Sequence, residues 1–348
     1  MWFSVLFAAP VPGGAAADER AVLRSCVEQA VRAEKYGFHR VWVMEHHGLA
    51  GYGHISSPDV LLAWIGARTS TLRLGVGVAM PPAINHPIRV AERVALLDVL
   101  SGGRADIAAA GGRSDCEAAL FGHDVSQADK ERDLALARIT RLWSDPSVEQ
   151  AAVLPRPVQM PHPPLFVSCG DGPSARRAGA LGLGALALGF GGIESAAELV
   201  GSYRAGTSSR CEPVVAQQNQ LSMLCPTVVL RDGERAEAIG HRAERYFRQA
   251  ANHWYAGGPE APGDEDGALA IAGAYGTSET ANEFAIALQS AGVDEVVLFV
   301  QMGTVSPDAC LETLERWGTE VLPSFADRGD DARFSRPTVS PNPSDLLA

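Results

Sequence analysis

The chain has 348 residues, enough for two average domains or for one (β/α) barrel with insertions, which commonly takes about 250 residues or more. Hydrophobic residues make up 46% of the sequence and charged residues 20%, which is ordinary for a soluble globular protein and excludes a disordered or fibrous chain. The formal net charge of −12 opposes binding to phosphate backbones, and no block of consecutive Lys and Arg overrides it, so no nucleic acid partner is expected.

The cysteines and the N-terminal segment indicate in which cellular compartment the protein is expected. The six cysteines are scattered, with no C-x-x-C pair and no spacing typical of a zinc or iron–sulfur site. Free thiols in a reducing cytoplasm explain them most simply. The apolar start and Ala15-Ala16-Ala17 resemble a short secretory segment, but no charged region precedes them. We interpret the start as a first strand, with a signal peptide as the alternative, and expect no membrane span because no run of about 18 apolar residues occurs.

Along the chain, apolar runs of strand length alternate with amphipathic stretches of helical length, a pattern typical of βα units around a parallel sheet. The predicted strands are residues 2–9, 39–44, 71–79, 104–110, 164–169, 183–189, 220–230 and 294–300. The predicted helices are residues 18–36, 58–68, 87–100, 127–143, 173–181, 194–204, 232–252, 278–291 and 307–322. Eight strands, each followed by a helix, favour an α/β fold of the TIM-barrel type, and an open doubly wound sheet is the alternative.

Capping residues support several of these helix boundaries. Asp18, Ser57 and Ser278 stand where a side chain can accept a hydrogen bond from the first turn of a helix. Gly37 and Gly292 lie at the predicted ends of two helices, where a glycine can adopt the left-handed backbone conformation that terminates a helix.

Two segments break the βα rhythm. Residues 256–268 are rich in Gly, Pro and acidic residues, which is typical of a surface loop or partial disorder, and whether they act as a lid stays open. Residues 326–348 hold many Ser, Pro and Asp residues and are expected to be a disordered tail. The prediction is therefore one barrel domain over residues 1–325 followed by that tail.

The second strand carries the most informative residues. It runs directly into Glu45-His46-His47, and in a TIM barrel the active site lies where the carboxyl ends of the strands meet the following loops. Histidine suits proton transfer near neutral pH, and a neighbouring carboxylate can hold its tautomer. From spacing alone, a pair of satisfied loop histidines is an equally good interpretation. A metal site that includes His54 is disfavoured, because the intervening loop fixes no geometry.

Three further segments follow predicted strands. His86 precedes a helix and is better explained as a packing or capping residue than as a pocket residue. Gly111 and Gly112, with Arg113 after them, would let a flat ligand or a phosphate approach the backbone. The turn from Ser168 to Ser174 enters a helix that carries Arg176 and Arg177, and a helix N-terminus commonly binds phosphate. Asp171 would repel a phosphate there, so we expect it to cap the helix.

Taken in order, these pieces resemble the bacterial luciferase-like, flavin-dependent monooxygenase family over most of residues 1–325. The stretches that carry the resemblance are residues 33–38 (AEKYGF), 41–47 (VWVMEHH), 57–58 (SP), 71–75 (TLRLG), 86–93 (HPIRVAER), 97–104 (LDVLSGGR), 121–122 (FG), 292–295 (GVDE) and 301–303 (QMG).

The resemblance implies a TIM barrel that binds reduced FMN, or a deazaflavin in one branch, at the carboxyl ends of the strands. It implies that His46 is the catalytic histidine, with Glu45 or a neighbour orienting it, and that relatives often have a cis peptide near Val78. The cofactor-binding residues it implies are Ala8, Val78, Ala79, Gly111, Gly112, Arg113, Ser168, Gly170, Gly172 and Ser174. No metal ligand is implied.

The sequence also departs from the family. Some relatives place an arginine for the phosphate where this chain has Gly111 and Gly112, so either Arg113 substitutes for it or the phosphate relies on backbone donors. The reactive cysteine of the luciferases is Ala110 here, so light emission is not implied.

The functional hypothesis is a monooxygenase that uses reduced FMN and dioxygen to oxygenate a small organic substrate. One alternative is a deazaflavin-dependent oxidoreductase that transfers hydride, and another is a non-catalytic flavin-binding protein on the same scaffold. The family further implies a separate flavin reductase and a homodimer formed through helices near the second and third strands. The substrate depends on loop residues that follow no readable pattern.

Overall fold

The computed structural model describes residues 1–80, 82, 84–112, 114–144, 153–187, 191–209, 218–255, 272–325 and 338–339. Within these residues, eight parallel strands form a closed TIM barrel, because the last of them, β10, pairs with both β1 and β8. The barrel strands are β1 (Trp2–Phe7), β2 (Arg40–Val43), β3 (Arg73–Ala79), β4 (Ala105–Ala109), β6 (Leu165–Cys169), β7 (Gly184–Ala187), β8 (Leu221–Val229) and β10 (Glu295–Phe299). All eight predicted strands and the predicted TIM barrel are confirmed, and the alternative of an open doubly wound sheet is excluded.

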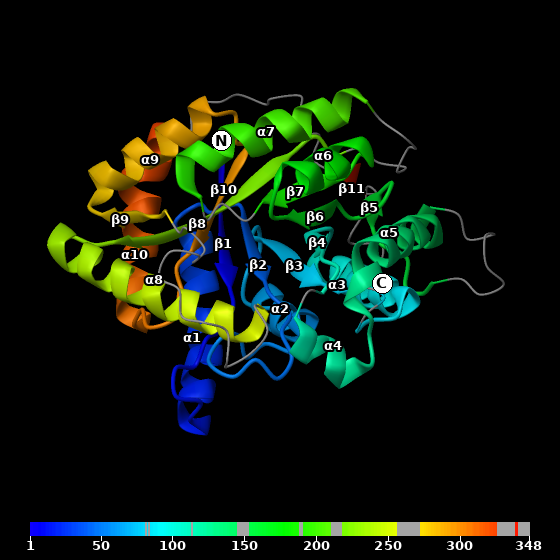
Figure 1. Ribbon diagram of the computed structural model, residues 1–348, viewed down its shortest axis with the longest axis horizontal. Helices are drawn as coiled ribbons and strands as arrows, with labels where there is room; N and C mark the ends of the chain where they lie inside the picture. The colour runs from blue at the N-terminus through cyan, green and yellow to red at the C-terminus, as the bar shows by residue number, and fades with distance from the viewer. Residues whose placement is uncertain are drawn as a thin grey trace.

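The helices pack around the outside of the strands (Figure 1). They are α1 (Ala16–Lys35), α2 (Pro58–Gly66), α3 (Pro87–Ser101), α4 (Asp115–Phe121), α5 (Ala128–Ser144), α6 (Gly172–Ala180), α7 (Gly192–Ser208), α8 (Gly233–Tyr255), α9 (Ser278–Ser290) and α10 (Pro307–Arg316). The nine predicted helices are confirmed, although the last one ends at Arg316 and continues as single turns, Trp317–Val321 and Leu322–Phe325. The sequence did not predict α4.

Short elements decorate the barrel. Strand β9 (Ala274–Gly276) pairs in parallel with the outer end of β8. Strand β5 (Gln159–Met160) pairs antiparallel with β11 (Thr338–Val339). Apart from those two residues of β11, the predicted tail lies outside the described residues, as does the segment 256–268. In the part of the chain that the structure describes, no helix has the length and apolar character needed to cross a membrane.

Two of the three predicted N-caps differ in the structure. Helix α1 begins at Ala16 without a side-chain cap, and Asp18 lies in its first turn, where a negative charge interacts favourably with the helix dipole. Helix α9 begins at Ser278, so its N-cap is Thr277. Ser57 precedes α2 as predicted, although its side chain accepts no hydrogen bond from that helix.

The middle of the barrel interior is filled by aromatic rings. Trp42 is fully buried and packs edge-on against Phe166, with ring centroids 5.3 Å apart. Gly75 and Gly77 on β3 make room for the indole, because a Cβ at either position would lie 2.2 Å or 2.5 Å from it. Since alternate residues of a barrel strand point inward, the glycines and the tryptophan form one packed layer.

A buried ionic layer lies beneath these rings. Arg40 is held by Asp106 at 2.7 Å and by Glu295 at 2.8 Å, and its guanidinium lies 4.8 Å from the centroid of the Trp42 ring. Arg73 pairs with the other oxygen of Asp106 at 2.6 Å. Burial alone would raise the pKa of Asp106, but the two guanidiniums hold that pKa below its ordinary value. Each charge in the layer is therefore paired, which is the condition for burying it.

Replacing Asp106 by Ala removes the acid paired with Arg73 and one of the two buried acids paired with Arg40, so we expect the free energy of unfolding to fall by about 3–5 kcal/mol. Urea denaturation at pH 7 followed by circular dichroism measures this change. The exposed Glu283→Ala on α9 is the matched control and should change stability by less than about 0.5 kcal/mol. A loss for Asp106→Ala as small as that of the control would contradict a stabilising role for the ionic layer.

Because the pKa of Asp106 is lowered in the folded protein, its contribution is present at neutral pH and is lost as the pH falls through that lowered value.

Candidate active site

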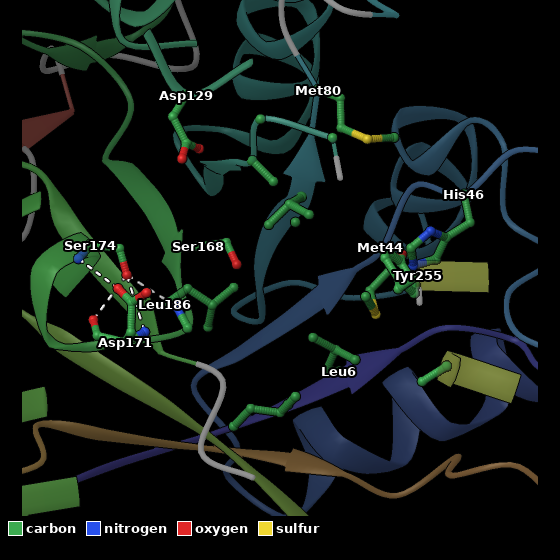
Figure 2. Close-up of a pocket in the computed structure, with 18 of the residues that line it drawn as sticks. Leu6, Met44, His46, Met80, Asp129, Ser168, Asp171, Ser174, Leu186 and Tyr255 are labelled. Atoms are coloured by element: carbon green, nitrogen blue, oxygen red, sulfur yellow. Dashed lines mark hydrogen bonds between the residues drawn. The ribbon is translucent and has the colours of Figure 1, made fainter. Parts of the chain in front are cut away.

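A cavity of about 800 Å³ opens at the carboxyl ends of the strands. It has two distinct ends, one around Met44, His46 and Tyr255 and the other around Ser168, Asp171 and Ser174 (Figure 2). The apolar part of its wall comes from residues of several strands and of α8, namely Leu6, Met44, Val78, Met80, Leu186, Leu224, Phe247 and Phe299. The predicted residues that line it are Glu45, His46, Val78, Gly111, Gly112, Ser168, Gly170, Gly172 and Ser174.

His46 is buried in the wall of the cavity, with 6% of its surface exposed. Its Nδ1 lies 3.3 Å from Oε1 of Glu117, and the same oxygen accepts the backbone N–H of His47 at 2.8 Å. An acceptor at Nδ1 favours the tautomer that carries its proton there. The other ring nitrogen, Nε2, is buried and has no hydrogen-bond partner among the described residues. This nitrogen is therefore available to accept a proton.

Glu45 interacts with the other histidine. Its Oε1 lies 3.1 Å from Nε2 of His47 and accepts a hydrogen bond from Asn85 at 2.8 Å. Asn85 in turn accepts from Arg93 of α3. The resemblance implied that Glu45 or a neighbour orients His46. In the structure the carboxylate beside His46 is that of Glu117, 71 residues along the chain, whereas Glu45 contacts His47. Successive residues of an extended chain point in different directions, so the neighbour in sequence need not be the neighbour in space.

Glu117 was not predicted as a site residue, because it lies on α4, a helix of only seven residues. The available signal was the spacing Ser114-x-x-Glu117, which is typical of a helix start. In the structure the side chain of Ser114 does accept the backbone N–H of Glu117, at 3.3 Å. Nothing in that spacing indicates that the carboxylate of Glu117 contacts a residue on the second strand.

Helix α8 holds the loop that follows His46. The hydroxyl of Tyr246 donates to the carbonyl of Gly51 at 2.9 Å, and the indole of Trp254 donates to the carbonyl of Ala50 at 3.3 Å. Tyr52 of the loop stacks on Phe247, with ring centroids 5.2 Å apart, and contacts the ring of His46 edge-on at 5.0 Å. The imidazole is therefore fixed on both sides by packed groups.

The opposite end of the cavity is built around the N-terminus of α6. Asp171 caps this helix by accepting the N–H of Ser174 at 2.8 Å, which is the role the sequence predicted for it. The hydroxyl of Ser174 accepts the N–H groups of Gly170 and Asp171, each at 3.2 Å. Three donors of this turn are thus engaged within the turn itself. A Cβ at Gly170 would meet nothing within 4 Å, so the turn borders open space.

One arginine near this end was not predicted. Arg132 of α5 lines the cavity, with its guanidinium 2.7 Å from Asp129 and 2.8 Å from Asp133. Asp129 and Glu198 line the cavity as well. Arg113, the arginine that the sequence analysis favoured, lies outside the described residues.

Two predicted cofactor residues do not line the cavity. Ala79 is buried with Leu74 and Val76 on the outer face of β3, because the register of β3 with β4 shifts between Gly77 and Ala79 and the strand's alternation is interrupted there. Gly77 and Val78 consequently both line the cavity. Ala8 is buried in the same cluster as Leu6 and Trp42. The peptide bond between Gly77 and Val78 is cis, in the region where the resemblance implied one.

The remaining histidines of the rim have structural contacts. His86 caps α3 by accepting the backbone N–H of Ile88, as predicted. His54 contacts Glu19 at 2.9 Å and accepts the N–H of Gly51 at 3.0 Å. Across the described ranges, no three His, Cys, Asp or Glu side chains are grouped as a metal site requires.

Comparison with known proteins identifies a family. A family model described as luciferase-like monooxygenase matches residues 1–317. The chain is 25% identical over 336 residues to the oxygenase component of a flavin-dependent trigonelline monooxygenase from Acinetobacter baylyi, a match that covers 89% of this chain and 91% of the relative.

Solved structures show the same fold. Monooxygenase RslO1 from Streptomyces bottropensis superposes with a TM-score of 0.80 at 24% identity, covering 94% of this chain and 100% of that one. The oxygenating constituent of 3,6-diketocamphane monooxygenase from Pseudomonas putida, solved with FMN, has a TM-score of 0.72 at 17% identity and coverages of 93% and 98%. An F420-dependent secondary alcohol dehydrogenase has a TM-score of 0.74 at 17% identity and coverages of 94% and 99%.

Gly53 gives a test of how closely the imidazole of His46 is placed. A Cβ at Gly53 would lie 2.7 Å from Cδ2 of His46, so Gly53→Ala should displace the ring and lower turnover roughly 10- to 100-fold. Steady-state kinetics measures this, with thermal unfolding to verify the fold. Gly201→Ala on α7 is the control, since a Cβ there meets nothing within 4 Å. Equal turnover in the two variants would contradict a fixed imidazole.

Proposed function

The chain belongs to the luciferase-like monooxygenase family of flavin-dependent enzymes, and from this premise we propose that it uses reduced FMN and dioxygen to add one oxygen atom to a small organic substrate. The observation that carries the proposal is the buried, unpartnered Nε2 of His46 in the wall of a largely apolar cavity. Such a nitrogen suits proton transfer beside a flat, apolar cofactor.

The residues of the cavity fit a flavin. Val78, Met80 and Leu186 offer apolar surface for the isoalloxazine ring, and the open space beside Gly170 leaves room for the phosphate end near Ser168 and Ser174. When bound, reduced flavin supplies the electrons that activate dioxygen. Binding at the carboxyl ends of the strands agrees with the general position of active sites in TIM barrels.

The protein contributes proton handling and exclusion of water. His46 accepts or returns a proton at Nε2, and Glu117 stabilises the positively charged ring through Nδ1. Tyr52 and Phe247 cover this end of the cavity and keep bulk water from it. His47, fixed by Glu45, supports the loop and takes no part in the chemistry.

The charges of the cavity favour FMN over a deazaflavin. The described lining residues include one arginine, Arg132, and five acidic residues. The acidic residues are Glu45, Glu117, Asp129, Asp171 and Glu198. The deazaflavin F420 carries a long, multiply anionic tail, which needs a basic channel, whereas FMN carries a single phosphate. The acidic lining would repel the larger anionic group more strongly.

We further propose a division of labour with a separate reductase, since the relative from Acinetobacter baylyi is named as an oxygenase component. We also propose that residues 1–325 act as one domain and that two copies pair through α2 and α3. Those helices expose large apolar side chains, namely Val60, Trp64, Leu96 and Leu100.

Replacing His46 by Ala should lower turnover by roughly two to four orders of magnitude, because this is the usual contribution of a positioned acid or base. His47→Ala, in the next position, is the matched control and should lower turnover much less. Stopped-flow turnover at saturating reduced FMN measures both, with FMN affinity determined separately. If His46→Ala turns over like the wild type while it still binds FMN, the assignment of His46 is wrong.

The cofactor is tested by incubating the protein with reduced FMN or with reduced F420 and measuring binding by equilibrium dialysis. We expect FMN to bind and dioxygen consumption to follow, because the acidic lining disfavours the anionic tail of F420. Tight binding of F420 without dioxygen uptake would overturn the proposal in favour of hydride transfer.

A further inference from the structure

Glu117 holds an unusual position in the cavity wall. Only 2% of its side chain is exposed, and its Oε1 already contacts Nδ1 of His46 and the backbone N–H of His47. Its second oxygen, Oε2, is buried and has no hydrogen-bond partner in the part of the chain that the structure describes. A buried carboxylate oxygen without a donor is costly, so a ligand that donates to it would be bound favourably.

The phenols beside Glu117 do not satisfy this oxygen. Tyr52 and Tyr255 hydrogen-bond with each other, and burial, the largest cause, raises the pKa of both hydroxyls. The negative charge of Glu117 raises these pKa values further. Glu117 and the ring of Tyr52 both contact His46, with the ring centroids of Tyr52 and His46 5.0 Å apart. The phenols therefore stay protonated at neutral pH, and they add no positive charge near Oε2.

No described arginine or lysine reaches this end of the cavity. The basic side chain in the described lining is Arg132, which belongs to the opposite end and is paired with Asp129 and Asp133. Glu45 adds a second carboxylate to the wall beside His46. An anionic substrate would be repelled here, and a neutral hydrocarbon would leave Oε2 without a partner.

The aromatic rings at this end favour a positive charge. Phe247 stacks on Tyr52, and the ring of Tyr255 lies edge-on to Tyr52 with centroids 5.5 Å apart. All three rings line the cavity (Tyr255 is labelled beside His46 in Figure 2). Aromatic rings attract cations, and desolvation strengthens that attraction.

We propose that the substrate is a small organic cation, a protonated amine whose N–H group donates to Oε2 of Glu117 among Tyr52, Phe247 and Tyr255. This inference rests on the proposed monooxygenase function and narrows its substrate class. Glu117 then has two tasks, because one oxygen positions His46 and the other binds the substrate. The amine nitrogen would then lie near the imidazole of His46, which Glu117 contacts through its other oxygen.

The test compares probes of similar shape and different charge. Benzylamine, benzyl alcohol and benzoate are titrated calorimetrically at pH 7 into the full-length protein with and without oxidised FMN, and n-butylamine and 1-butanol form a second series. We expect each amine to bind at least about tenfold more tightly than its uncharged partner, as a charge-assisted hydrogen bond provides. Equal affinities within both series, or no measurable binding of either amine, would overturn the proposal.

Variants connect this preference to Glu117. Glu117→Gln keeps the shape of the side chain and removes its charge, so the preference for amines should fall to less than about threefold. Glu117→Asp keeps the charge and should retain the preference, which guards against a merely structural effect. Glu283→Gln on the exposed side of α9 removes one charge far from the cavity and should change nothing. A preference that persists in Glu117→Gln with the wild-type melting temperature would exclude Glu117 as the binding group.

These measurements do not depend on turnover. A wrong proposed function would appear as missing FMN binding or missing dioxygen uptake, whereas a wrong substrate class would appear as equal binding of amines and alcohols.

Discussion

The packing of Trp42 inside the barrel is the constraint on which the rest of the structure depends. The indole fills the interior only because β3 carries glycines at positions 75 and 77, and it lies above the buried guanidinium of Arg40. A barrel closed in this way has a solid middle, with the charges below it and the cavity above it. The carboxyl ends of the strands can then supply a site whose floor is dry and rigid.

Above that floor, the site is assembled from loops that α8 ties together. The loop after β2 and the segment that carries Ser114 both contact the C-terminal part of α8, the first through Tyr246 and Trp254 and the second through the carbonyl of Trp254. This arrangement sets His46 beside Glu117 although they come from different loops. It also separates the aromatic end of the cavity, around His46, from the end at α6.

The sequence predicted those features that depend on local patterns. The spacing of hydrophobic residues and the composition of short sequence segments indicate strands and helices. The alternation of these segments therefore predicted all eight barrel strands. His46 was found because it directly follows a strand, and Asp171 because its charge conflicts with a phosphate unless it caps the helix. Glu117 was missed because its pairing with His46 is a contact between distant segments, and no local pattern encodes it. Ala79 was expected beside Val78 in the cavity, but a register shift between Gly77 and Ala79, which no local pattern encodes, leaves it on the outer face of β3.

The ionic layer beneath Trp42 joins the beginning of the chain to its end, which has a consequence for synthesis on the ribosome. Arg40 meets Asp106 early, but Glu295, its other partner and the acceptor for the hydroxyls of Ser4 and Ser222, is among the last barrel residues to be made. At about 5–20 residues per second, the interval between the two acids is roughly 10 to 40 seconds. Until then the growing chain lacks one of the two acids that pair with Arg40 and the strand that pairs with the other edge of β1. Completion of the fold is thereby coupled to the arrival of β10, and a truncated chain lacks the contact that closes it.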